Sequence, residues 1–114
     1  MDRGELVSVR VAPEWITDCL WILRTGDDIP QNTAPSDLVE DYGVPAGLAA
    51  GIEVWDDEFQ AVFDHDDPMA SGFPDEATTT AWRDRGERLA HDLAAALGVR
   101  VEFHVAGHDR VITP

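Results

Sequence analysis

Lysine is absent from the sequence, cysteine occurs once, and no apolar run approaches the length that spans a bilayer. The lone thiol, Cys19, excludes an internal disulfide framework and fits a reducing compartment. Nucleic-acid binding requires clustered basic side chains, yet the chain has only eight arginines against 23 acidic residues, for a net charge of -15. No basic, apolar N-terminal segment indicates a signal peptide. We therefore expect a cytoplasmic protein that binds neither nucleic acid nor membranes.

The length and the apolar content are sufficient for one folded domain. The chain has 114 residues, of which 44% are hydrophobic, and these include four Trp and four Phe. A domain typically has about 100 to 200 residues, so we expect residues 1–114 to form one domain. The apolar fraction is too high for a disordered acidic tail.

Alternating apolar and polar residues predict strands near both ends of the chain. Val7, Val9 and Val11 alternate with polar residues, which is typical of a strand with one buried face. A short connection beginning at Ala12 would make the next strand antiparallel to the first. The Pro, Gly and Asp content of residues 26–36 indicates a loop. The predicted strands cover residues 6–11, 19–23, 99–105 and 110–113.

Two long helices are predicted between these pairs of strands. Apolar residues recur at helical spacing from Pro45 onward, and again after Gly72, where Pro74 falls in the first turn. A short helical turn is expected over residues 37–42, and Gly98 is placed to end the last helix. The two apolar stripes consist of Leu48, Ile52, Trp55, Phe59 and Val62, and of Trp82, Leu89, Leu93 and Leu97. This order predicts an α+β fold with two layers: an antiparallel or mixed sheet of about four strands, with the two long helices on one face.

The acidic residues are concentrated in one part of the sequence. Residues 25–82 contain fourteen Asp and Glu but no Arg or Lys, whereas the flanking segments are nearly balanced. We expect one side of the fold to carry a negative field that speeds encounter with a cationic partner. The alternative interpretation is that the acidity serves solubility, or life at high salt, and has no binding role.

Several short motifs in the central part of the chain resemble those of a known group of proteins. The motifs are Glu53-Val54-Trp55-Asp56-Asp57-Glu58-Phe59, Asp66-Asp67-Pro68, Ser71-Gly72-Phe73-Pro74, and Gly86 with Leu89-Ala90. Over residues 44–103 the chain is similar to small acidic, uncharacterised proteins of high-GC actinobacteria. The resemblance implies a shared fold unit, and it implies no catalytic residue.

The densest group of potential metal ligands is Asp64-His65-Asp66-Asp67, between the two long helices. Three carboxylates within four residues supply part of the oxygen shell that Ca²⁺ or Mg²⁺ requires, but the spacing is not that of an EF-hand. A solvated turn is the alternative that we favour. A zinc site of His65, His104 and His108 has no ligand-spacing motif in its support. We therefore expect neither a metal nor a cofactor.

Nucleophilic catalysis has little support in the sequence. Cys19 adjoins an apolar run, where a buried thiol stays inert. Ser71 lacks the Gly-x-Ser-x-Gly elbow, and the chain contains no glycine-rich phosphate loop. We therefore expect no catalytic residue and a protein that is not an enzyme.

The small size and the base-free stretch favour a non-enzymatic binding protein. Our leading hypothesis is an immunity or antitoxin-type inhibitor whose acidic face docks on a basic partner such as a nuclease toxin. We expect Trp15 to anchor this contact, unless it packs in the core behind the first strand. The expected partner-binding residues are Trp15, Asp56, Asp57, Glu58, Asp64, Asp66 and Asp67. Two alternatives are a metal-assisted hydrolase that uses residues 64–67, and an accessory domain that dimerises.

Overall fold

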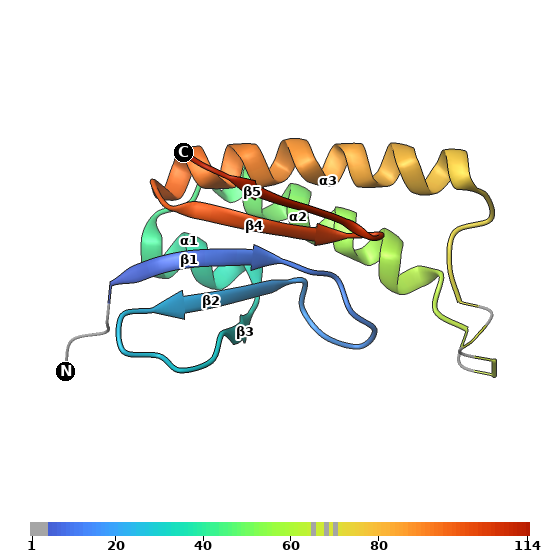
Figure 1. The fold of residues 1–114 in the computed structure, drawn as a ribbon, viewed down its shortest axis with the longest axis horizontal. Coiled ribbons are helices and arrows are strands. Elements are labelled where there is room, and N and C mark those ends of the chain that lie inside the picture. The colour runs from blue at the N-terminus through green and yellow to red at the C-terminus, as the bar shows by residue number, and fades with distance from the viewer. Residues whose placement is uncertain (1–4, 65, 68, 70) are drawn as a thin grey trace.

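The structure, a computed structural model, describes residues 5–64, 66, 67, 69 and 71–114, and arranges them as a five-stranded sheet with helices behind it (Figure 1). The elements in chain order are β1 (Leu6–Val11), β2 (Leu20–Arg24), β3 (Gln31–Thr33), α1 (Pro35–Tyr42), α2 (Ala46–Ala61), α3 (Glu76–Leu97), β4 (Arg100–Val105) and β5 (His108–Ile112). The predicted α+β architecture is confirmed. No helix in these described ranges is both long and apolar enough to cross a membrane.

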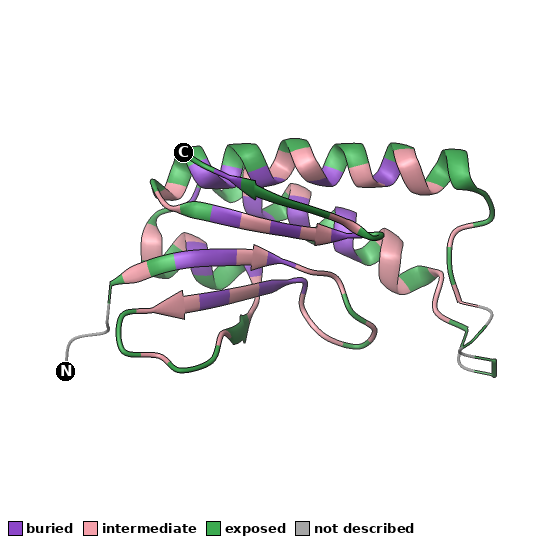
Figure 2. Ribbon diagram, in the orientation of Figure 1, coloured by how far each residue is buried: buried purple, intermediate pink, exposed green. Residues whose placement is uncertain are grey.

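The sheet has the strand order β3-β2-β1-β4-β5 and is mixed. The two central strands, β1 and β4, run parallel, and every other pair is antiparallel. Val9, Val11 and Phe103 point into the core, as their alternation predicts. Val7 is 39% exposed instead, because the register between β1 and β2 shifts between Leu6 and Ser8. In Figure 2 the buried residues accordingly recur along the central strands and on the inner sides of the helices.

One strand was not predicted, and some element boundaries differ from those expected. The segment expected to be a loop contains β3, which pairs with β2. The side chain of Asn32 strengthens this pairing, because its amide donates a hydrogen bond of 3.0 Å to the backbone oxygen of Leu20. The last helix begins at Glu76 rather than around Pro74, because the carboxylate of Asp75 accepts a hydrogen bond of 2.7 Å from the N–H of Thr78 and caps the helix there.

The last two strands form a hairpin with a two-residue loop. Ala106 and Gly107 have φ angles of 51° and 74°, and positive φ at both positions is the mark of a type I′ turn. His108 therefore pairs directly with Val105, and β5 begins two residues earlier than the sequence pattern predicted.

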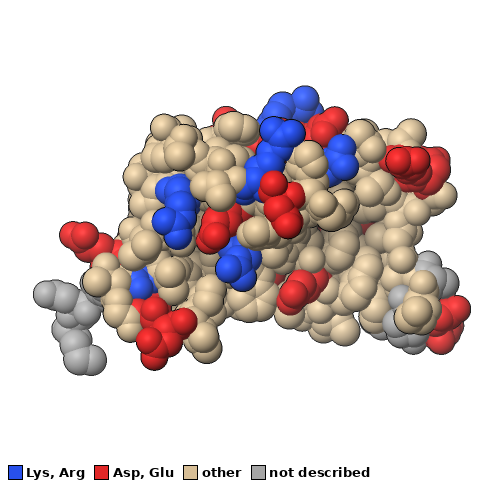
Figure 3. All heavy atoms as spheres, in the orientation of Figure 1, with Lys and Arg blue, Asp and Glu red and all other residues tan. Residues whose placement is uncertain are grey.

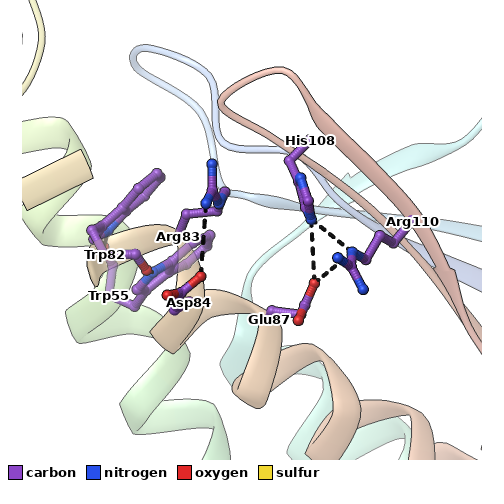
Figure 4. A network of polar contacts seen from close by, with 7 residues as sticks. All are labelled: Trp55, Trp82, Arg83, Asp84, Glu87, His108 and Arg110. Carbon is purple, nitrogen blue, oxygen red and sulfur yellow. Dashed lines mark hydrogen bonds and ion pairs between the residues drawn. The ribbon is translucent and has the colours of Figure 1, made fainter. Parts of the chain in front are cut away.

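A reciprocal pair of tryptophans joins the two long helices. The indole N–H of Trp55 donates to the backbone oxygen of Trp82 at 2.8 Å, and the indole N–H of Trp82 donates to that of Trp55 at 2.9 Å. The rings are stacked, with centroids 4.4 Å apart (Figure 4). Gly86 faces this pair, and a methyl group at that position would overlap the six-membered ring of Trp55. The crossing of α2 over α3 therefore depends on a residue without a side chain.

We predict that Gly86→Ala lowers the free energy of unfolding by about 1 to 3 kcal/mol, because overpacking outweighs the better helix propensity of Ala. Gly47→Ala is the matched control: a Cβ there meets nothing within 4 Å, so the same change should add about 0.5 to 1 kcal/mol. Urea unfolding of both variants measures the difference. A Gly86→Ala protein as stable as wild type would contradict the packing described here.

Candidate partner-binding surface

The connection between β1 and β2, residues 12–19, is longer than the tight turn expected and lies against α2. Gln60 holds it through both ends of its amide. Its Nε2 donates to the backbone oxygen of Glu14 at 2.7 Å, and its Oε1 accepts from the N–H of Ile16 at 2.9 Å. Gln60 was not among the predicted site residues. The one feature of the sequence that indicates its role is that it follows Asp56 by four residues on the same helix, a spacing at which two side chains can contact each other.

Ile16 occupies a strained position within this connection. Its φ is 67°, which is rare for a β-branched residue, and its side chain is 76% exposed. Backbone strain persists only where the surroundings enforce it, and here the hydrogen bond to Gln60 does so. The result is an apolar side chain held out into solvent.

Trp15 packs beside Ile16 in a different way. Its ring stacks on that of Phe59 with centroids 3.9 Å apart and planes 7° apart, and it also contacts Phe63. Trp15 is nevertheless only half-buried. Among the four tryptophans, it alone donates no hydrogen bond from its indole N–H to any residue that the structure describes. Trp15 thus packs on α2 and not in the core behind β1, and its role as an anchor for a partner stays a prediction.

Trp15 also lines a hollow of about 210 Å³. We call this the aromatic hollow. It lies where the β1–β2 connection, the start of α3 and the β4–β5 turn meet, and its lining residues are Pro13, Trp15, Phe59, Gly72, Phe73, Thr79, Trp82, His104, Val105 and Ala106. None of these residues is acidic.

Asp56 does not belong to an exposed acidic face, contrary to expectation. It is only 8% exposed and accepts a hydrogen bond of 3.3 Å from Gln60. Burial raises the pKa of its carboxyl to about 6, and the negative charges of Asp18 and Asp57 add to this rise. Hydrogen bonds from Gln60 and from the N–H of Cys19 act in the opposite direction, because they stabilise the carboxylate. The position was readable in the sequence, because Asp56 follows Ile52 by four residues and so lies on the apolar stripe.

The other expected contact residues divide into two groups. Glu58 is engaged within the chain, where its carboxylate takes two hydrogen bonds of 2.9 and 3.0 Å from Arg85. Asp57, Asp66 and Asp67 are exposed and form no ion pair with any arginine that the structure describes.

Asp64 shapes the loop between α2 and α3. Its carboxylate accepts from the N–H groups of Asp66 and Asp67 at 3.0 Å each, and its own N–H donates to the hydroxyl of Ser71 at 2.7 Å. These bonds are those of an Asx-type turn, the alternative favoured over a metal site. In the part of the chain that is described, no group of three or more His, Cys, Asp or Glu is arranged to hold a metal ion.

Among the described residues, His104 and His108 contact different carboxylates, and Cys19 is buried. His65 lies outside the described residues. His104 pairs with Asp109 at 2.9 Å, whereas His108 lies 3.7 Å from Glu87, which also pairs with Arg110 at 3.0 Å (Figure 4). Burial raises the pKa of the Cys19 thiol far above its ordinary value, so the thiolate is disfavoured.

The base-free stretch does not form one continuous face. It runs from the loop after β2, at the left of Figure 1, through α1 and α2 to the loop before α3 at the right, so its charges are spread over the length of the molecule. In Figure 3 arginines and carboxylates intermingle over the middle of the sheet, while the right end shows carboxylates alone. We define the acidic end as residues 12–19 and 57–79, which contain nine Asp and Glu and no Arg or Lys.

Comparison with known proteins gives one result. The model of the family described as Serratia CdiI immunity protein-like matches residues 7–107. The match therefore covers β1 to β4, except for the first residue of β1, and ends just before β5; it includes every residue that lines the aromatic hollow. No curated protein matches the chain.

We predict that Asp56→Asn changes how stability depends on pH. Because the pKa of Asp56 in the folded protein, about 6, lies above the ordinary value for an aspartate, the folded state binds more protons than the unfolded state. Wild-type stability should therefore fall as pH rises from about 4 through about 6. Asn removes this dependence, so the variant should be more stable by about 1 to 3 kcal/mol at pH 7 to 8. At pH 4 it should gain nothing. Urea unfolding across this range is the measurement, with the exposed Asp57→Asn as control; parallel pH profiles for the two variants would contradict the burial of Asp56.

Proposed function

The chain belongs to the Serratia CdiI immunity protein-like family, and we propose that it neutralises a protein toxin by binding it at the acidic end. An immunity protein acts by holding its toxin in an inactive complex, which requires a complementary surface and no catalytic group. The proposal is thus of an inhibitor rather than an enzyme.

The observation that carries this proposal is the unbalanced charge of the acidic end. Asp57, Asp66 and Asp67 are exposed, and no arginine in the described part of the chain neutralises them. Two other carboxylates do pair with arginine: Glu58 within the acidic end with Arg85, and Glu87 outside it with Arg110. Unpaired carboxylates that repel one another are better accounted for by a cationic partner than by the needs of folding.

The proposed partner is a toxin with a basic active site. A nuclease, for example, binds phosphate with a cationic groove, and a rigid carboxylate surface can occupy that groove. Trp15 and Ile16 would supply the apolar contact at the centre, since aromatic anchors with a polar rim dominate the energy of such interfaces. Asp56 and Glu58 were predicted from the sequence to contact the partner, but they take no part in the proposed contact.

We predict that Asp66→Asn combined with Asp67→Asn slows association with the toxin domain that the chain neutralises about 3- to 10-fold at low salt. The difference should shrink as salt approaches 1 M, where the screening length falls to about 3 Å. Stopped-flow or surface plasmon resonance kinetics measure the rates.

The matched control is Glu40→Gln combined with Glu53→Gln, which removes the same charge from exposed positions on α1 and α2. Its association rate should stay close to that of wild type. Equal slowing by both double variants would show that net charge alone matters, and no slowing by either would contradict a role for the acidic end.

A further inference from the structure

The aromatic hollow differs chemically from the surface around it. Phe59, Phe73 and Trp82 line it together with Trp15, and none of its lining residues carries a carboxylate. Trp82 is buried, whereas the other three rings are half-buried, so the hollow reaches from the surface to the edge of the core. Ring contacts hold these walls in place: Phe59 and Phe73 lie 5.5 and 4.9 Å from Trp82.

The size of the hollow indicates what it can hold. Pockets for small-molecule ligands usually measure about 300 to 1,000 Å³. A hollow of about 210 Å³ is below that range and suits one large side chain. An apolar recess within a protein surface is a typical place for the anchor residue of a partner.

The charges around the hollow indicate which residues flank that side chain in the partner. Within the described residues, the segments that supply Trp15 and Gly72 to the hollow also carry carboxylates of the acidic end. These are Glu14 and Asp18 in the β1–β2 connection, and Asp66 and Asp67 in the loop before α3. A partner segment that reaches the hollow therefore passes over carboxylates before it meets aromatic rings. We infer that the aromatic hollow receives one large aliphatic side chain of the toxin, and that this side chain is flanked by arginine or lysine. The inference rests on the proposed function and specifies the chemistry of the partner at that site.

Three synthetic peptides test this pattern on the full chain. The first is an acetylated pentapeptide amide with leucine between two pairs of arginines; the second has alanine at the centre; the third has leucine with serine in place of every arginine. Dissociation constants follow from NMR titration of the indole N–H signals. We expect the first peptide to bind at least about tenfold more tightly than the second, since even one methylene in an apolar pocket changes affinity by about that factor. The signal of Trp15 should shift most.

Two variants locate the effect. Thr79→Phe places a ring in the hollow and should reduce the affinity for the leucine peptide to that for the alanine peptide. Ala77→Phe, two residues away and exposed outside the hollow, should bind both peptides as wild type does. Phe73→Ala removes one wall instead of filling the space, and it should also abolish the preference for leucine.

The outcomes separate the two claims. Equal binding of the leucine and alanine peptides, or no binding of the leucine peptide at millimolar concentration, overturns the hollow as the anchor site. If the serine-flanked leucine peptide binds as tightly as the arginine-flanked one, while leucine is still preferred over alanine between arginines, the hollow is supported but the flanking cations, and with them the role of the acidic end in this contact, are overturned.

Discussion

The reciprocal hydrogen bonds between Trp55 and Trp82 are the constraint on which the rest of the structure depends. Two buried indoles each need an acceptor, and each finds it in the backbone of the other residue, so α2 and α3 can cross in only one register. Gly86 provides the space for that crossing. The crossing brings the end of α2 and the start of α3 to the same end of the molecule, and Trp82 itself lines the aromatic hollow there. The core thus determines the shape of the proposed binding surface.

A second, less favourable arrangement holds the β1–β2 connection on α2. Gln60 bonds to the connection at both ends of its amide, yet the same arrangement buries the carboxyl of Asp56 and keeps Ile16 at a positive φ. Both features cost stability, because a buried carboxyl resists ionisation and a β-branched residue resists that backbone conformation. Unfavourable features that persist are commonly found where a protein binds something; here Ile16 lies in the acidic end and Asp56 directly precedes its second segment.

The sequence predicted the layers of the fold better than the site. Helical and strand periods are local, so the stripes containing Ile52 and Leu93 and the alternation in β4 were sufficient. Strand β3 was missed because its three residues, Gln31, Asn32 and Thr33, are all polar and show no apolar alternation. Asp56 was predicted to be exposed because it is charged, but its position on the apolar stripe of α2 buries it. The negative charge was expected on one side because it is contiguous in sequence, but the chain carries it from one end of the molecule to the other.

The central claim is that the acidic end, with its aromatic hollow, is the surface that binds the toxin. Hydrogen–deuterium exchange of the chain, alone and in complex with the proposed toxin partner, tests this most directly. The account predicts slower exchange on binding in residues 12–19 and 71–79, and unchanged exchange in α1 and β3. Protection confined to α1, to β3 or to the open face of the sheet would contradict it.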